Sequence, residues 1–282
     1  MRAIAWNMNW KRADANWSLL RPRADLDCDI ALLSEATPPP GDLGMEVIGD
    51  EVTIGRDDVS QGGKKTRLWS TYVASKRHPV PPSDVWTLPP GHEGKDRRAP
   101  LKCSRPGAWA AAVVPLANGG SVTAISLYGL LDDCSDASVH RSISDLTALL
   151  EDERYNGLLL MGGDLNTLAS QPLTSRALAR DQGVLDRITK GFGLIDLLHE
   201  DLRMNHPDRG RLENCKCELG DDCRHTWTFR HNSDLTIPHQ DDYLFASGEL
   251  AERLVSCEAF GAFIEGEKSP SDHQPLVATF KD

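Results

Sequence analysis

The amino-acid sequence predicts an α/β protein in which two β-sheets pack face to face, with helices on the outside. Three observations predict this fold class. The chain contains many short apolar runs of strand length and few segments with helical spacing. The two halves of the chain, divided near residue 150, are both rich in such strands. The 282 residues are 40% hydrophobic and 26% charged, a composition that provides a sizeable core in a soluble protein. Two layered sheets covered by helices are one of the standard ways to bury strands of this kind.

The first half of the chain is predicted to hold six strands before its first long helix. Apolar or alternating runs predict strands at residues 2–8, 29–33, 47–54, 69–75, 108–115 and 121–128. Residues 10–20 have helix-like spacing of their apolar side chains. Asn118-Gly119-Gly120 joins the last two strands and is a strong hairpin signal. Apolar residues at helical spacing predict a helix over 138–152, with Ser135 or Asp136 as its N-cap.

The second half is predicted to alternate between strands and shorter helical segments. Residues 157–161 form a continuous apolar run typical of a core strand, and residues 173–190 have helical spacing. The remaining predicted elements are a short apolar element at 194–198, an alternating run at 225–229, a strand at 242–247 followed by a Gly248-Glu249 turn, and two final strands at 254–263 and 274–280.

The chain has no linker-like break, so we expect one domain over residues 1–282 with two polar insertions. The insertions lie at about 77–107 and about 203–224. The first is rich in proline, glycine and charge, and it is the most basic stretch of an acidic chain because of Lys95, Arg97, Arg98 and Lys102. Two interpretations of this stretch are open: a solvated loop, or a lip that contacts substrate phosphates.

Charge and hydropathy exclude some classes of protein. The formal net charge of −11 argues against a protein held on nucleic acid by a broad basic surface, although it does not exclude a nucleic-acid substrate. The sequence has no run of 18 or more apolar residues and its N-terminus has no signal-peptide pattern, so we expect a cytoplasmic protein with no membrane-spanning segment. No obligate protein partner is evident.

Polar side chains recur at the ends of the predicted strands. Each residue alone could have a purely structural role, as the end of a strand, a solvated acid or part of an Asx turn. Their repetition at successive strand ends instead predicts a single site, because strands of one sandwich bring their ends together. The residues are Asn7, Glu35, Asp164, Asn166, Asp242, Asp272 and His273.

In order along the chain, these residues lie in short motifs that resemble those of the endonuclease/exonuclease/phosphatase superfamily, which includes pancreatic-type deoxyribonuclease and apurinic endonucleases. The motifs are Trp6-Asn7, Leu32-Leu33-Ser34-Glu35, Gly163-Asp164-Leu165-Asn166, Asp241-Asp242-Tyr243-Leu244-Phe245 and Ser271-Asp272-His273. The resemblance covers nearly the whole chain and implies a four-layer α/β sandwich with the site where the strand ends of both sheets meet. Two departures stand out: Ser34 occupies a position where many members have glutamine, and Tyr128-Gly129 replaces a common His-Leu pair.

The resemblance also implies a role for each residue. Glu35 would be the principal Mg²⁺ ligand, with Asn7 and Asp272 close by, and Mn²⁺ is the alternative cation. Asp164 would activate water, and His273 would pair with Asp242. Asn166 would orient the phosphate, and Tyr128 would lie near the scissile phosphate.

These residue types suit phosphodiester hydrolysis, because that reaction builds negative charge on phosphate oxygens. A hard cation held by carboxylates and fixed hydrogen-bond donors both stabilise such charge. The leading hypothesis is therefore an Mg²⁺-dependent phosphodiester hydrolase that acts as an endo- or exonuclease on DNA or RNA, with Arg97, Arg98 and Trp86 as candidate contacts to the polymer. The alternatives are hydrolysis of a small phosphoester such as a nucleotide, an inositol phosphate or a phospholipid headgroup, and a binding or scaffold protein without turnover.

A second possible metal site lies in the polar insertion near residue 215. Cys215, Cys217, Cys223 and His225 place three thiols and one imidazole within eleven positions. Three cysteines and a histidine are a known tetrahedral Zn²⁺ set, so a structural zinc is one interpretation. Free thiols, a redox pair and another metal are the interpretations that stay open.

Overall fold

The computed structural model of the 282-residue chain contains two β-sheets that lie face to face. The structure describes residues 1–9, 11–49, 70–82, 85–86, 98–99, 101–130, 138–167, 175–213, 215, 217, 223–230, 239–261 and 270–282. The first sheet has six strands in the order β12-β13-β1-β2-β4-β3. They are β12 (Leu254–Ala259), β13 (Leu276–Phe280), β1 (Arg2–Asn7), β2 (Ile30–Ala36), β4 (Ser70–Ser75) and β3 (Glu46–Ile48).

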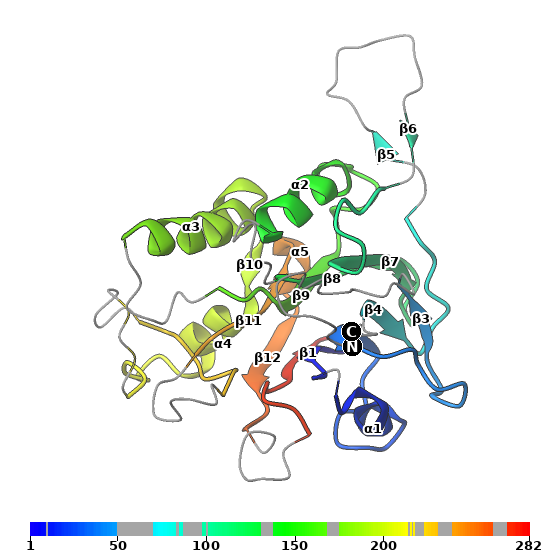
Figure 1. Ribbon diagram of the computed structural model, residues 1–282, viewed down its shortest axis with the longest axis horizontal. Coiled ribbons are helices and arrows are strands. Elements are labelled where there is room, and N and C mark those ends of the chain that lie inside the picture. The colour runs from blue at the N-terminus through cyan, green and yellow to red at the C-terminus, as the bar shows by residue number, and fades with distance from the viewer. Residues whose placement is uncertain are drawn as a thin grey trace, which may run out of the picture.

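The second sheet has five strands in the order β10-β11-β9-β8-β7. They are β10 (Ile195–Asp196), β11 (Asp242–Ala246), β9 (Leu159–Asp164), β8 (Ser121–Tyr128) and β7 (Trp109–Pro115). The helical segments are α1 (Ala13–Asn16), a 3-10 turn (Trp17–Leu20), α2 (Ser138–Leu150), α3 (Ser175–Asp186), a π-helical turn (Arg187–Gly191), α4 (Leu197–Asn205) and α5 (Gly248–Ala251). In Figure 1, α2 and α3 lie on one side of the sheets and α1 lies on the other, whereas α4 and α5 contribute leucines to the core between the sheets.

Alternation of side chains along the strands creates the layers. On β1, Ala3 and Ala5 point into the core between the sheets, whereas Ile4 and Trp6 point to the opposite face and pack with α1 and the 3-10 turn. On β8, Ala124 belongs to the core between the sheets and Ile125 packs under α2. Each sheet is therefore covered on both faces, as a four-layer sandwich requires. This confirms the predicted fold class (Figure 1).

Most predicted elements are present, and three differ. The predicted short element at 194–198 runs into a helix, α4, that continues to Asn205. The second insertion, predicted to start at about residue 203, therefore starts inside this helix. Asp196 caps α4 by accepting hydrogen bonds from the backbone N–H groups of Leu198 and His199, and the helix buries leucines against the core. The predicted Gly248-Glu249 turn is the start of α5. Residues 225–229 form two isolated bridges, from Phe229 to His239 and to His273, instead of a strand.

Parts of the first insertion fold back on themselves. β5 (Val85–Trp86) and β6 (Arg98–Ala99) pair as a separate two-stranded ribbon that projects beyond α2 in Figure 1. Arg97, Lys95, the predicted caps Ser135 and Asp136, and residues 52–54 of the third predicted strand lie outside the described residues, as do the side chains of Trp86 and Arg98.

The strand directions bring several chain segments to one edge of the sandwich. β1 and β2 run parallel in the first sheet, and β8 and β9 run parallel in the second. β13 and β11 run antiparallel to them, so these two strands begin where the others end. In the second sheet, Asp164 lies opposite both Tyr128 and Asp242 in the strand register. Residues that are far apart in the sequence therefore meet at this edge.

Gly163, one residue before Asp164, is required by the close packing of β9 and β8. Its φ is +139°, and a Cβ atom there would lie 2.0 Å from the carbonyl oxygen of Leu127. We expect Gly163→Ala to lower the free energy of unfolding by about 3 kcal/mol, because the backbone must move and the residue is strained. Gly157→Ala is the matched control, since nothing lies within 4 Å of its added Cβ. Urea unfolding of both variants measures the effect, and equal losses would contradict the packing argument.

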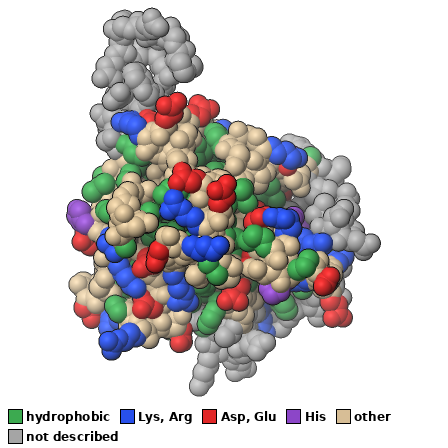
Figure 2. Space-filling view, turned by 180° about the vertical axis from the view of Figure 1, so that it is seen from behind, with side chains coloured by type: hydrophobic (Ala, Val, Ile, Leu, Met, Phe, Trp, Pro, Cys, Tyr) green, Lys and Arg blue, Asp and Glu red, His purple; other side chains and the backbone are tan. Residues whose placement is uncertain are grey.

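Surface charge on the back of the molecule is mixed. Lys and Arg side chains are scattered among Asp and Glu side chains on the face in Figure 2, which agrees with an acidic chain of net charge −11. Among the described segments, no helix has the length and hydrophobicity that crossing a membrane requires. The cytoplasmic location stays a prediction.

Candidate active site

Asp164, the last residue of β9, is the most heavily hydrogen-bonded carboxylate at this edge. Its Oδ2 accepts from Asn7 Nδ2 at 2.8 Å and from Asn166 Nδ2 at 3.2 Å, and its Oδ1 accepts from the Asn166 backbone N–H at 2.8 Å. The side chain is buried. Burial raises the pKa of Asp164 to about 7, although His273 and the Asn7 hydrogen bond act in the opposite direction. A carboxyl group with this pKa can exchange a proton near neutral pH.

His273 is held against two acids. Its Nδ1 lies 2.8 Å from Asp242 Oδ2, and its Nε2 lies 3.8 Å from Asp164 Oδ2. Burial alone lowers the pKa of His273, but the charges of Asp242 and Asp164 outweigh this and raise its pKa well above the ordinary value. The imidazolium form is therefore favoured at neutral pH. The predicted His273–Asp242 contact is present in the structure.

Three residues to which the sequence assigned no role position His273. The ring of Phe229 packs against it, with centroids 4.5 Å apart and the ring planes tilted by 32°. The Ser271 hydroxyl accepts from the His273 backbone N–H at 3.1 Å and donates to the carbonyl oxygen of Asn7 at 2.8 Å. Trp6 Nε1 donates to the His273 carbonyl oxygen at 3.2 Å. Ser271 and Trp6 belong to the sequence motifs, which was a usable signal, whereas Phe229 lies in no motif.

Glu35 is turned out of the β2 ladder toward Tyr128. Its φ of +48° is in the left-handed region, and the β2–β4 register shifts between Leu33 and Ala36. Such an irregularity re-aims a side chain at the end of a strand. The Tyr128 hydroxyl donates to Glu35 Oε1 at 2.8 Å. Burial, followed by the charges of Glu35 and Asp164, raises the pKa of Tyr128 well above its ordinary value, so the hydroxyl keeps its proton.

The other two predicted metal ligands, Asn7 and Asp272, are joined through Asn9. The Asn9 backbone N–H donates to Asn7 Oδ1 at 2.9 Å, and Asn9 Nδ2 donates to Asp272 Oδ1 at 3.0 Å. Asn9 has a φ of +48° and was missed by sequence reasoning, although it follows Asn7 by two positions. Glu35 lies one residue beyond Ser34, the register partner of Asn7. Asn7 and Glu35 thus lie at the ends of neighbouring strands, and Asp272 lies in the loop before β13. Two carboxylates and an amide oxygen are donor types that suit a hard divalent cation.

A second compact group of acids with an imidazole lies at this edge, apart from the predicted Mg²⁺ ligands. Potential ligand atoms of Asp164, Asp242 and His273 all lie within 4.8 Å of one another. We interpret this group as a hydrogen-bonded pair beside a carboxylate, because the 2.8 Å separation of His273 Nδ1 and Asp242 Oδ2 is an ordinary charge-assisted hydrogen bond.

Asp241 adds a further buried acid that sequence reasoning did not assign. Burial, followed by the charge of Asp164, raises the pKa of Asp241 well above its ordinary value. Its Oδ1 has no hydrogen-bond partner among the described residues. Both effects favour the neutral form of this carboxyl group. The Asp241-Asp242 repeat was the available signal.

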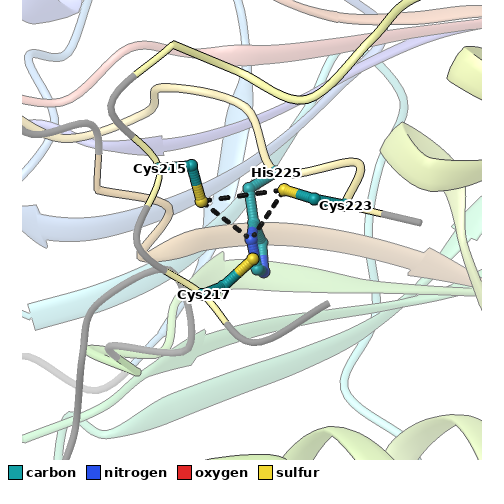
Figure 3. A group of neighbouring side chains, drawn as sticks. All are labelled: Cys215, Cys217, Cys223 and His225. Carbon is teal, nitrogen blue, oxygen red and sulfur yellow. Dashed lines mark hydrogen bonds between the residues drawn. The ribbon is translucent and has the colours of Figure 1, made fainter. Parts of the chain in front are cut away.

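The cysteine-rich segment forms a compact cluster of its own, shown in Figure 3. Cys215 Sγ and Cys223 Sγ are 3.6 Å apart, and each lies 3.5 Å from His225 Nδ1. The three cysteines are buried. Burial, with smaller contributions from Arg211 and His199, lowers the pKa of His225 to about 4.

Comparison with solved structures places the fold among known proteins. No family model matches the sequence, and a search of curated proteins found no match. Solved structures do match over the full length of this chain. An AP endonuclease from Archaeoglobus fulgidus is 18% identical with a TM-score of 0.61, and each chain is covered completely. A 3′ phosphatase from Neisseria, solved with a product DNA hairpin, is 20% identical with a TM-score of 0.59 and complete coverage of both chains.

A third structure, an AP endonuclease from Leishmania major, is 13% identical with a TM-score of 0.62, and 87% of its chain is covered. A further match is described as an endonuclease/exonuclease/phosphatase from Beutenbergia cavernae. The chain therefore has the endonuclease/exonuclease/phosphatase fold, which confirms the resemblance that the motifs indicated.

Proposed function

We propose that this protein is a metal-dependent phosphodiester hydrolase, with nucleic acid as its substrate class. The observation that carries the proposal is the buried Asp164 carboxylate, which lies between two asparagines and the His273–Asp242 pair. This group gives a base that can exchange a proton near neutral pH, next to a cationic donor. Proteins of the same fold that are described as AP endonucleases and a 3′ phosphatase support the assignment to nucleic acid.

In the proposed reaction, a water oxygen attacks phosphorus and one P–O ester bond breaks. Asp164 aligns this water and accepts its proton, for which a pKa of about 7 is well matched. His273, held in place by Asp242, directs its positive charge at the phosphate oxygens. Asn166, whose Nδ2 also donates to the Gly129 carbonyl oxygen at 2.8 Å, orients the phosphate. The leaving oxygen departs with the electron pair of the broken bond and takes a proton from the surroundings.

The carboxylates of Glu35 and Asp272 and the amide oxygen of Asn7 would hold a divalent cation, Mg²⁺ or Mn²⁺. When bound, the cation would neutralise charge on the phosphate oxygens. Tyr128 positions Glu35 through their hydrogen bond and lies next to Asp164 in the strand register. Arg97 and Arg98 stay candidates for contacts to the substrate backbone.

The proposal is tested by turnover of single- and double-stranded DNA, abasic DNA, RNA and bis(p-nitrophenyl) phosphate, with and without Mg²⁺ or Mn²⁺. Cleavage of a polymer only when metal is present is the expected result. Turnover of the small ester alone would keep the site and move the substrate to small phosphoesters. No turnover of any substrate would overturn the proposal in favour of a binding protein.

Glu35→Gln is expected to raise the Mg²⁺ concentration for half-maximal activity at least about tenfold, because it removes a charged ligand and keeps the side-chain shape. A Mg²⁺ titration of kcat measures this shift. Glu249→Gln is the matched control, since this exposed glutamate on α5 pairs with Arg253 instead of facing the site. An unchanged Mg²⁺ dependence in Glu35→Gln would remove Glu35 from the metal site.

A further inference from the structure

The cluster of Cys215, Cys217, Cys223 and His225 has the dimensions of a tetrahedral metal site. Zinc–sulfur bonds of about 2.3 Å and zinc–nitrogen bonds of about 2.0 Å imply ligand separations of about 3.8 Å between sulfurs and about 3.5 Å between sulfur and nitrogen. The separations here are 3.6 Å for Cys215 Sγ to Cys223 Sγ and 3.5 Å from each of these sulfurs to His225 Nδ1. All four ligand atoms lie within 4.8 Å of one another, including Cys217 Sγ (Figure 3).

Two arginines lie beside the cluster. Arg211 Nη2 donates to the carbonyl oxygens of Cys215 and Cys217, so its guanidinium lies beside the segment that holds both sulfurs. Arg224 Nη1 donates to the carbonyl oxygen of Cys223 at 3.0 Å. Two cations next to three thiols offset the negative charge that three thiolates would bring to a dication. Soft thiolate donors with one imidazole select zinc over Mg²⁺ or Ca²⁺.

The described residues around the cluster have little secondary structure or apolar packing that could hold them in place. Residues 206–213 and 223–228, together with Cys215 and Cys217, contain no helix or strand. Of the described apolar side chains, only Leu212 packs against the cysteines. A buried cluster of three cysteines without an apolar core around it is typical of a small metal-organised unit, in which metal binding supplies the folding free energy.

One end of this unit leads directly into the active site. The Thr226 backbone N–H donates to Gln240 Oε1 at 2.9 Å, and the Thr228 hydroxyl accepts from the backbone N–H groups of Asp241 and Asp242 at 3.0 and 3.1 Å. Phe229 then packs against the His273 ring, and the Arg230 backbone N–H donates to the Asp272 carbonyl oxygen at 2.8 Å. Only three residues separate His225 from Phe229.

We propose that Cys215, Cys217, Cys223 and His225 bind one structural Zn²⁺ ion, which fixes residues 223–230 against the catalytic histidine. All four coordination positions are filled by protein, so this ion has no open position for water or substrate. The site is separate from the proposed Mg²⁺ ligands, which are oxygen donors on other segments. The proposal therefore does not depend on the hydrolase activity.

The first test is the metal content of protein purified without chelators, measured by inductively coupled plasma mass spectrometry. We expect about one zinc per chain in the wild type and a loss of at least about fivefold in Cys223→Ser. Cys103→Ser is the matched control, because its sulfur donates to the Arg105 carbonyl oxygen and lies outside the cluster. Glu35→Gln should also keep its zinc, which separates this ion from one bound at the catalytic edge.

A second test uses only wild-type protein, so it holds even if Cys223→Ser fails to fold. Wild-type protein is stripped with a zinc chelator and reloaded with Co²⁺ or Zn²⁺ in the presence of Mg²⁺. We expect Co²⁺ to give a thiolate-to-metal charge-transfer band. We also expect peptides covering 223–230 to lose hydrogen-exchange protection when stripped and regain it with Zn²⁺, while β1 is unchanged. Absence of bound zinc, a Cys215–Cys223 disulfide in the purified protein, or exchange that is insensitive to zinc would overturn the proposal.

Discussion

Asp164→Asn is expected to lower kcat/KM for the cleaved substrate about 1,000-fold, because an amide cannot accept the proton of the attacking water. The substitution keeps the side-chain shape but only one of the two acceptor positions, because Oδ2 accepts from the Asn7 and Asn166 side chains and Oδ1 accepts from the Asn166 backbone N–H. Some stability is therefore lost as well, so kcat/KM is compared at a temperature at which the variant is folded. Steady-state kinetics with matched circular dichroism spectra measure it.

The control for this variant is Asp201→Asn. Asp201 is also buried, but its carboxylate accepts from Asn205 and from the Cys257 backbone N–H, away from the site. Activity should change less than about threefold there, since the remaining oxygen still accepts a hydrogen bond. A similar loss in both variants would show that removal of any buried carboxylate disturbs the enzyme. It would contradict the assignment of Asp164 as the base.

The same residue sets an expected pH dependence. Because burial raises the pKa of Asp164 to about 7, its carboxylate form is present above that pH and is lost as pH falls through it. We expect wild-type kcat/KM to fall about tenfold per pH unit below this value. Asp164→Asn should lack this acid limb. An acid limb of the same midpoint in the variant would assign it to another group.

His273→Ala is expected to lower kcat/KM about 100- to 1,000-fold, and Asp242→Asn about 10- to 100-fold, because the first removes the cation and the second removes its partner. The two residues share one hydrogen bond of 2.8 Å, so the double variant should be little worse than His273→Ala alone. A double-mutant cycle in kcat/KM measures this coupling.

Added imidazole provides the control for that pair. It should restore part of the activity of His273→Ala, because the cavity left by the ring keeps Asp242 as a partner. It should restore less in the double variant, where the carboxylate is gone. Multiplicative losses in the cycle, together with equal rescue in both backgrounds, would show that Asp242 does not act through His273.

The spacing of apolar side chains along the sequence predicted most of the strands and helices correctly. The alternation of β1 and β8 and the helical spacing of residues 138–150 depend on nearby residues, and the structure reproduces them. α4 was missed because residues 194–198 were recognised only as a short apolar element, and its cap, Asp196, itself pairs with Phe245 in a strand. Residues 225–229 alternate like a strand, yet only Phe229 forms bridges. Thr228 and Phe229 do bond through their backbones to His239 and Gln274, but the Thr226 N–H and the Thr228 hydroxyl form side-chain bonds to residues 240–242, so the ladder does not extend.

The sequence by itself determined the two-sheet α/β class, the order of the motifs and the identities of the acids, amides and imidazole at the strand ends, because each depends on residue type and local period. The tertiary structure alone decided which of them touch: Asp164 meets Asn7 across the two sheets, and Asp242 meets His273 across 31 residues. It also decided that Glu35 and Asn9 adopt left-handed backbone conformations, and that Phe229 covers the histidine. Contacts of this kind, like the raised pKa of Asp164, arise from burial between packed sheets, which no local stretch of sequence contains.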